Sequence, residues 1–162
     1  MNIQSISIYS YAYDQQHAFY CNQLQLTCLE KTHETFTVMA GSSLLKIVRS
    51  NTPLYSCYHL AFNIEPSLLL SSASYLKGRN IALIENDRQV LIDFPDWNAR
   101  SVYFSDADGN VLEFIARYNL LHTLLNRSFS GQNIICISEA GIPAEDTESF
   151  ISRLQQHTTA EI

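Results

Sequence analysis

The chain has 162 residues, of which 46% are hydrophobic and 16% are charged. A chain of this length and composition can bury a substantial core, and this excludes intrinsic disorder. The formal net charge is −6 at pH 7, and the sequence has no cluster of Lys or Arg. This charge balance argues against nucleic acids and anionic membranes as partners.

The sequence also predicts a cellular compartment. The N-terminal residues contain no basic segment followed by an apolar one, so we expect no signal peptide. No apolar run approaches the ~18 residues of a membrane-spanning helix. The four cysteines, Cys21, Cys28, Cys57 and Cys136, show neither CxxC nor metal-like spacing. We therefore expect reduced, mostly buried thiols in a cytoplasmic protein.

The first half of the chain reads as a strand, a helix and further strands. Apolar and polar residues alternate over 3–10, which predicts a half-buried strand. Asp14 is expected to cap a helix in which apolar residues recur at helical spacing: Ala18, Cys21 and Leu24. Two further strands are predicted over 34–40 and 44–48.

The same order recurs in the second half. A strand over 57–64 precedes a helix that begins at Pro66 and ends at Gly78. Asp108 and Gly109 form a favoured hairpin turn between two later strands. The strands predicted after this helix cover residues 81–85, 88–94, 101–105 and 110–118.

A match between the two halves supports duplication. Residues 41–49 align with 109–117, with glycine opposite glycine at the start and arginine opposite arginine at the end. The alignments make two pairs of equivalent positions: Leu45 with Glu113, and Ser5 with His59. The chain then continues with a predicted strand over 133–138 and a helix over 145–157. These two elements either open a third repeat or pack on the existing sheet.

Three motifs can be compared with those of known families: Tyr20, His59-Leu-Ala-Phe-Asn-Ile64 and Phe104-Ser-Asp-Ala-Asp-Gly-Asn-Val-Leu-Glu113. Together they resemble the vicinal oxygen chelate superfamily, which includes glyoxalase I, bleomycin-resistance proteins and extradiol dioxygenases. Ala107 stands where that family usually has proline. The stretches 93–98 and 114–117 are similar to an uncharacterised glyoxalase-like branch.

The resemblance implies an α+β fold, in which paired βαβββ modules form a curved mixed sheet around a cavity. The expected domain covers residues 1–118, with modules 1–50 and 55–118, followed by a C-terminal extension over 119–162. Half-domain sheets of this kind leave exposed edges and a cavity mouth, so we also expect a homodimer.

The family's metal ligands come from the first and last strands of each module. Carried over by position, they are Ser5, Leu45, His59 and Glu113, of which His59 and Glu113 suit a divalent Zn, Ni, Fe or Mn ion. A one-residue slip in the repeat would replace Leu45 by Lys46, whose charge repels a cation. The implied activity is that of a metal-dependent lyase or dioxygenase acting on a small oxygenated molecule, with Glu113 as ligand or catalytic base.

A metal-free alternative fits the same residues. His59 and Glu113 can satisfy each other's hydrogen bonds and line a pocket for a small hydrophobic or aromatic ligand, as in bleomycin-resistance proteins. A third hypothesis is a scaffold whose function is dimerisation. The weaker candidates for lining the pocket are Ser5, Trp97, Asn98 and Tyr103.

Overall fold

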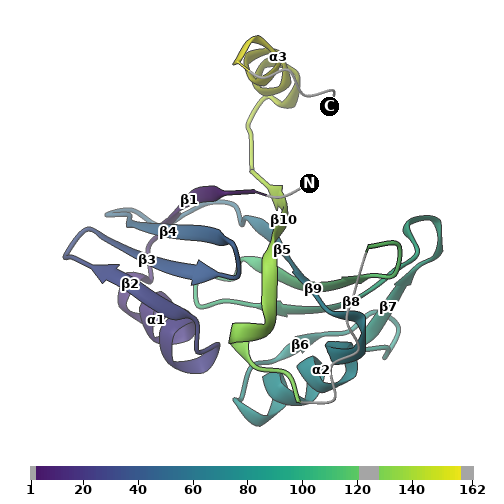
Figure 1. The fold of residues 1–162 in the computed structure, drawn as a ribbon. Helices are drawn as coiled ribbons and strands as arrows, with labels where there is room; N and C mark the ends of the chain where they lie inside the picture. Colours follow the sequence, from purple (N-terminus) through teal and green to yellow (C-terminus); the bar gives the residue numbers. More distant parts are fainter. Residues whose placement is uncertain (1–2, 121–127, 158–162) are drawn as a thin grey trace.

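The computed structural model describes residues 3–120 and 128–157 (Figure 1). The first module contains β1 (Ser5–Ser10), α1 (Tyr13–His17), the π-helix η1 (Ala18–Gln23), β2 (Thr27–Lys31), β3 (Thr35–Ala40) and β4 (Ser43–Arg49). These strands form a sheet in the order β1-β4-β3-β2, in which β1 and β4 run parallel. A strand, a helix and then strands follow in the predicted order, and β2 is an additional strand beyond the two predicted over 34–40 and 44–48.

The second module repeats this plan. It contains β5 (His59–Ile64), the 3₁₀ turn η2 (Pro66–Leu68), α2 (Leu69–Gly78), β6 (Leu83–Ile84), β7 (Leu91–Phe94), η3 (Pro95–Trp97), β8 (Ala99–Ser105) and β9 (Val111–Arg117). The sheet order is β10-β5-β9-β8-β6, with β7 also paired to β8. Neither sheet closes into a barrel, and the predicted α+β fold of paired βαβββ modules is confirmed.

Each sheet buries one face against its own helix. Successive side chains of a strand point to opposite faces. In the second module, Phe62 of β5 and Phe114 of β9 are fully buried in the main core, together with Leu69 and Leu76 of α2. The residues between them in the strands, Ala61 and Glu113 among them, therefore lie on the opposite face. We call it the open face because α2 packs on the other side of the sheet, although most of the side chains on it are buried. The candidate site lies on this face.

The C-terminal segment extends the second sheet. After the turn η4 (Gly131–Asn133), β10 (Ile134–Gly141) pairs antiparallel with β5, and Ile3 bridges to Ile137. β10 thus runs between the two modules (Figure 1). The helix α3 (Thr147–His157) stands away from both sheets. The domain boundaries and the third repeat stay predictions, and residues 121–127 and 158–162 of the predicted extension lie outside the described residues.

The two modules are joined by hydrogen bonds that side chains of the Asp106–Asn110 turn accept from the first module. Asp106 accepts from Gln16 Nε2 at 2.7 Å and from the Tyr20 hydroxyl at 3.0 Å, and Asp108 accepts from the backbone N–H of Ala12 at 2.8 Å. The expectation that Asp14 caps the first helix is wrong, because the helix begins at Tyr13 and Asp14 makes no cap bond. The carboxylate that accepts a hydrogen bond at the start of this helix belongs to Asp108, which lies 96 residues after Ala12 in the chain.

Candidate functional site

His59 and Glu113 lie side by side on the open face of the second sheet. In the parallel β5–β9 ladder, His59 pairs with Val111 and Ala61 pairs with Glu113. The two side chains therefore point to the same face, and His59 Nε2 lies 3.0 Å from Glu113 Oε2. The His59 side chain is 34% exposed and that of Glu113 only 3%. A ligand that reaches this pair meets the imidazole first.

β8 supplies two further polar side chains to this pair. Ser101 donates a hydrogen bond of 2.5 Å to Glu113 Oε1. Tyr103 pairs directly with Glu113 in the β8–β9 ladder, and its ring stacks on His59 with centroids 6.2 Å apart. Both carboxylate oxygens of Glu113 are therefore occupied by groups of the protein itself.

The hydrogen bonds set the ionisation of the pair. The hydrogen bond to Glu113 raises the pKa of His59, although partial burial opposes it. Burial raises the pKa of Glu113, but the hydrogen bonds from His59, Ser101 and Tyr103 outweigh burial and leave it lowered. Both shifts favour an imidazolium beside a carboxylate. A lowered pKa makes Glu113 a weak general base.

Three more polar residues occupy this face, and none of them is among the predicted site residues. Glu139 pairs with Ala61 across β10 and β5, and it forms an ion pair with Arg117 of β9. Arg117 Nη1 and Asn63 Oδ1 are buried and have no hydrogen-bond partner among the described residues. By strand alternation, Asn63 shares the face of Ala61, and Arg117 shares the face of Glu113. The face thus carries a buried donor and a buried acceptor for which the described part of the chain supplies no partner.

Two of the weaker pocket candidates lie at one edge of this face, in the turn between β7 and β8. The Trp97 ring stacks on Phe94, with centroids 5.5 Å apart, and is 60% exposed. Phe94 in turn packs against the small cluster of Ala61, Ala99 and Ile115 on the open face. Asn98 adopts a left-handed conformation and donates to Asn119 Oδ1 at 2.6 Å, so its amide serves the turn.

Ser5 lies apart from His59, because β10 runs between β1 and β5. Strand pairing also shifts the predicted repeat by one residue. Ser5 pairs with Leu44, whereas its equivalent His59 pairs with Val111. The position that corresponds to Glu113 is therefore Lys46. Leu45 is fully buried in the core on the other face.

This arrangement fits a chelated metal poorly. Catalytic zinc usually has three protein ligands, and His59 and Glu113 supply two. The other carboxylate of this face, Glu139, forms an ion pair with Arg117. Of the two remaining positions that the resemblance assigns, one is a serine and the other a lysine. Within residues 3–120 and 128–157, His, Cys, Asp or Glu ligand atoms gather in threes at a different place, His17, Cys21 and Cys28. The face therefore does not supply the three ligands of a catalytic zinc ion.

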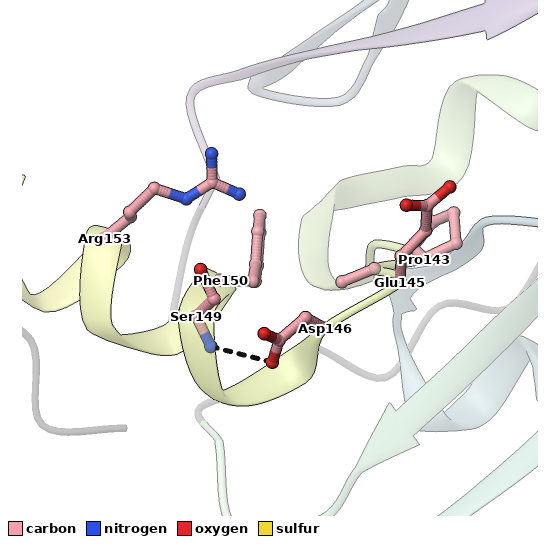
Figure 2. A pocket seen from close by; sticks show the side chains of 7 residues that line it. Pro143, Glu145, Asp146, Ser149, Phe150 and Arg153 are labelled. Carbon is pink, nitrogen blue, oxygen red and sulfur yellow. Dashed lines mark hydrogen bonds between the residues drawn. The ribbon is translucent and has the colours of Figure 1, made fainter.

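A pocket of about 420 Å³ lies beside the start of α3 (Figure 2). Its lining residues are Pro143, Ala144, Glu145, Asp146, Ser149, Phe150 and Arg153. Asp146 Oδ1 accepts from the backbone N–H of Ser149 at 3.1 Å, as the dashed line shows. This pocket contains none of the predicted site residues. The Asp146 carboxylate stabilises the beginning of the helix through its bond to Ser149.

Solved structures of known proteins share this architecture. A lactoylglutathione lyase from Agrobacterium tumefaciens superposes with a TM-score of 0.60 at 18% identity, over 70% of this chain and 92% of that one. A glyoxalase/bleomycin resistance protein/dioxygenase from Nocardioides gives 0.59 at 15% identity, over 75% and 87%. The protein has the vicinal oxygen chelate fold.

An integron cassette protein from the Halifax Harbour sewage outfall metagenome also superposes on this chain, with a TM-score of 0.61 at 16% identity over 70% of this chain and 97% of that one. No protein-family model and no curated protein sequence matches the chain. None of the described helices is both long and apolar enough to span a bilayer. The homodimer and the cytoplasmic location stay predictions.

Proposed function

We propose that the protein binds a small oxygenated molecule with an apolar or aromatic body on the open face of its second module, without a metal ion. The observation that supports this most strongly is a pair of buried groups, Arg117 Nη1 and Asn63 Oδ1, that find no hydrogen-bond partner within residues 3–120 and 128–157. Leaving a buried donor or acceptor unsatisfied costs about 1–3 kcal/mol. A ligand that accepts from Arg117 and donates to Asn63 recovers this free energy.

His59 completes the polar end of the proposed site. Glu113 is hydrogen-bonded to His59 and to Ser101, and the Tyr103 ring stacks on the His59 ring. These contacts fix the position of the imidazole. One ring nitrogen of His59 faces Glu113, which leaves the other available to an oxygen of the ligand. Because the pKa of His59 is raised, the ring keeps its second proton up to a higher pH than an ordinary histidine does. Both ring nitrogens are donors in this protonated form.

The Phe94–Trp97 stack supplies an apolar wall. Phe94 packs against the cluster of Ala61, Ala99 and Ile115 on this face, and Trp97 stacks on Phe94. Trp97 is exposed at the edge, where a flat ligand can stack on the indole. A polar end and an aromatic wall are the two parts that a small-molecule site requires.

A divalent metal held by His59 and Glu113 is the second candidate, because the two ligand atoms lie 3.0 Å apart and one structural neighbour is a lactoylglutathione lyase. The other carboxylate of this face, Glu139, is ion-paired with Arg117, and the described residues gather no third ligand atom beside His59 and Glu113, which speaks against this candidate. Metal content therefore separates the two candidates.

A thermal-shift screen of chelator-treated protein against benzoates, phenols and hydroxyketones tests the proposal. At a ligand concentration of 100 Kd, binding stabilises by about 2.7 kcal/mol, which raises Tm by roughly 5–10 °C for a chain of this size. The Arg117→Gln variant should lose the shift. Arg49→Gln, at the equivalent end of β4, is the matched control and should keep it. No shift with any compound, or a shift that persists in Arg117→Gln, would overturn the proposal.

A further inference from the structure

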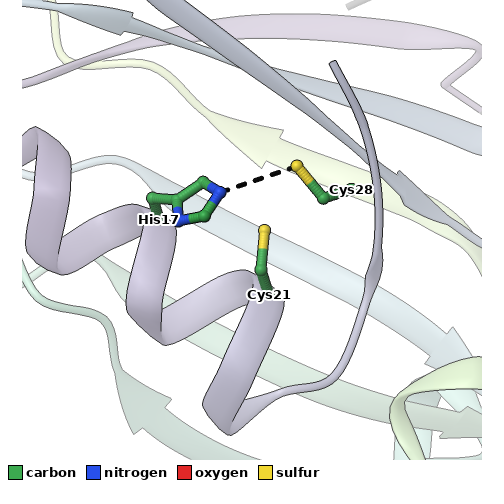
Figure 3. Close-up of side chains that lie close together, drawn as sticks. All are labelled: His17, Cys21 and Cys28. Atoms are coloured by element: carbon green, nitrogen blue, oxygen red, sulfur yellow. Dashed lines mark hydrogen bonds between the residues drawn. The ribbon is translucent and has the colours of Figure 1, made fainter. Parts of the chain in front are cut away.

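A second cluster of chemically reactive side chains lies in the first module. His17 ends α1, Cys21 lies one turn later in η1, and Cys28 comes from β2 at the edge of the first sheet. Figure 3 shows the three side chains pointing toward one another. His17 Nε2 lies 3.7 Å from Cys28 Sγ, and the three ligand atoms all lie within 4.8 Å of one another.

The local fold brings these residues together from separate elements. η1 is a π-helix, in which the Leu24 N–H bonds to the Phe19 carbonyl, and such wider turns are frequent at functional sites. Cys28 pairs with Val38, which is buried in the core, so Cys28 faces the helix side of the sheet. The His17 ring stands edge-on to Phe36, with centroids 5.2 Å apart. The imidazole is therefore held in place before any ion binds.

We propose that His17, Cys21 and Cys28 form a Zn²⁺ site with a fourth position open to solvent. Two thiolates and one imidazole are a known ligand set of zinc, and three protein ligands leave one tetrahedral position for water. Sulfur ligands select zinc over magnesium, calcium or manganese. Binding displaces the thiol protons to solvent, as at any cysteine site.

This site is independent of the proposed ligand-binding face. It lies between helix and strand in the first module, whereas His59 and Glu113 lie on the open face of the second. Cys28 is exposed and Cys21 is half-buried, so an ion has access from solvent. The expectation that the cysteines are mostly buried is wrong, since Cys57 is also exposed and Cys136 alone of the four is buried.

Anaerobic titration of reduced, chelator-treated full-length protein with Co²⁺ tests the proposal, because cobalt in a thiolate site gives a ligand-to-metal charge-transfer band. We expect one equivalent of Co²⁺ to develop the band and Zn²⁺ to bleach it. Cys28→Ser should weaken binding by more than about 100-fold, because losing even a supporting outer residue costs 10–100-fold. Cys57→Ser, which alters another exposed thiol, is the matched control. A band that is missing, or that survives in Cys28→Ser, would overturn the site.

A measurement on the unmodified chain covers the case in which Cys28→Ser fails to fold. We expect Zn²⁺ to slow alkylation of Cys21 and Cys28 by iodoacetamide at least about tenfold, a factor that corresponds to 1.4 kcal/mol of protection, and to leave the rate at Cys57 unchanged. Peptide mass mapping reads each thiol separately. Equal alkylation rates at Cys28 with and without Zn²⁺ would contradict the proposal.

Discussion

Replacing Asp106 by alanine is expected to lower the free energy of unfolding by about 3 kcal/mol or more. Asp106 is 7% exposed, and its Oδ2 accepts hydrogen bonds from Gln16, Tyr20 and Asn110. Its Oδ1 accepts from the backbone N–H groups of Asp108 and Asn110. The variant leaves several buried donors unpaired, each at a cost of about 1–3 kcal/mol.

Urea unfolding followed by circular dichroism measures this effect. Asp96→Ala is the matched control, because Asp96 is an exposed aspartate in the turn between β7 and β8. Surface substitutions of this kind usually change stability by less than about 0.5 kcal/mol. If Asp106→Ala is no less stable than Asp96→Ala, the turn does not join the modules as described.

Replacing Glu113 by alanine is expected to destabilise the protein by about 2 kcal/mol near pH 5.5. The variant removes the acceptor of Ser101 and the partner of His59, both on a largely buried face. Glu113→Gln keeps an acceptor oxygen and should lie between wild type and Glu113→Ala. Equal stability of all three proteins would show that the pair contributes nothing to the fold.

The pH dependence of this difference follows from the two pKa shifts. The pKa of His59 is raised above 6.5, so its contribution is complete below 6.5 and is lost as the pH rises through the folded-state pKa. The pKa of Glu113 is lowered below 4.5, so its contribution is complete above 4.5 and is lost as the pH falls through the folded-state pKa. The difference between wild type and Glu113→Ala should therefore be largest between pH 4.5 and 6.5. A difference that does not change with pH would contradict the ion pair.

Local patterns predicted most of the strands and helices, β2 excepted, because each module is built from sequence-adjacent elements, whereas the arrangement as paired βαβββ modules came from the family resemblance. Alternation predicted β1, and the turn at Asp108 predicted the β8–β9 hairpin. Two features depend on distant residues. A nine-residue match cannot choose between Leu45 and Lys46, and strand pairing selects Lys46 as the equivalent of Glu113. The first helix takes its carboxylate from Asp108 of the other module.

Part of the candidate site was predictable from the sequence and part of it was not. His59 and Glu113 were predicted as a pair because the first and last strands of a module are neighbours, and the structure places them 3.0 Å apart. Arg117 and its mirror Arg49 looked equivalent in sequence. Arg49 stacks on Tyr13, whereas Arg117 pairs with Glu139 of β10, and its buried Nη1 has no partner in the described part of the chain. Pairing of β10 with β5 creates this difference, and no local signal around Arg117 indicates it.

The cluster of His17, Cys21 and Cys28 was not predicted from the sequence, for a related reason. His17 and Cys21 lie four residues apart in the helical segment, a spacing that places two side chains on one face. Cys28 joins them because the chain reverses into β2 and returns along the helix. Sequence spacing alone, with three and six residues between the ligands, matches no common zinc motif.

The central claim is that the His59–Glu113 face works without a metal, and metal content in matched variants tests it most directly. The protein is purified without a histidine tag or chelator, and its transition metals are measured per chain in wild type, Glu113→Ala and Cys28→Ser. We expect any metal in wild type to be retained in Glu113→Ala and lost in Cys28→Ser. About one metal per chain that disappears in a folded Glu113→Ala variant and persists in Cys28→Ser would contradict the claim, and would make the face a metal centre.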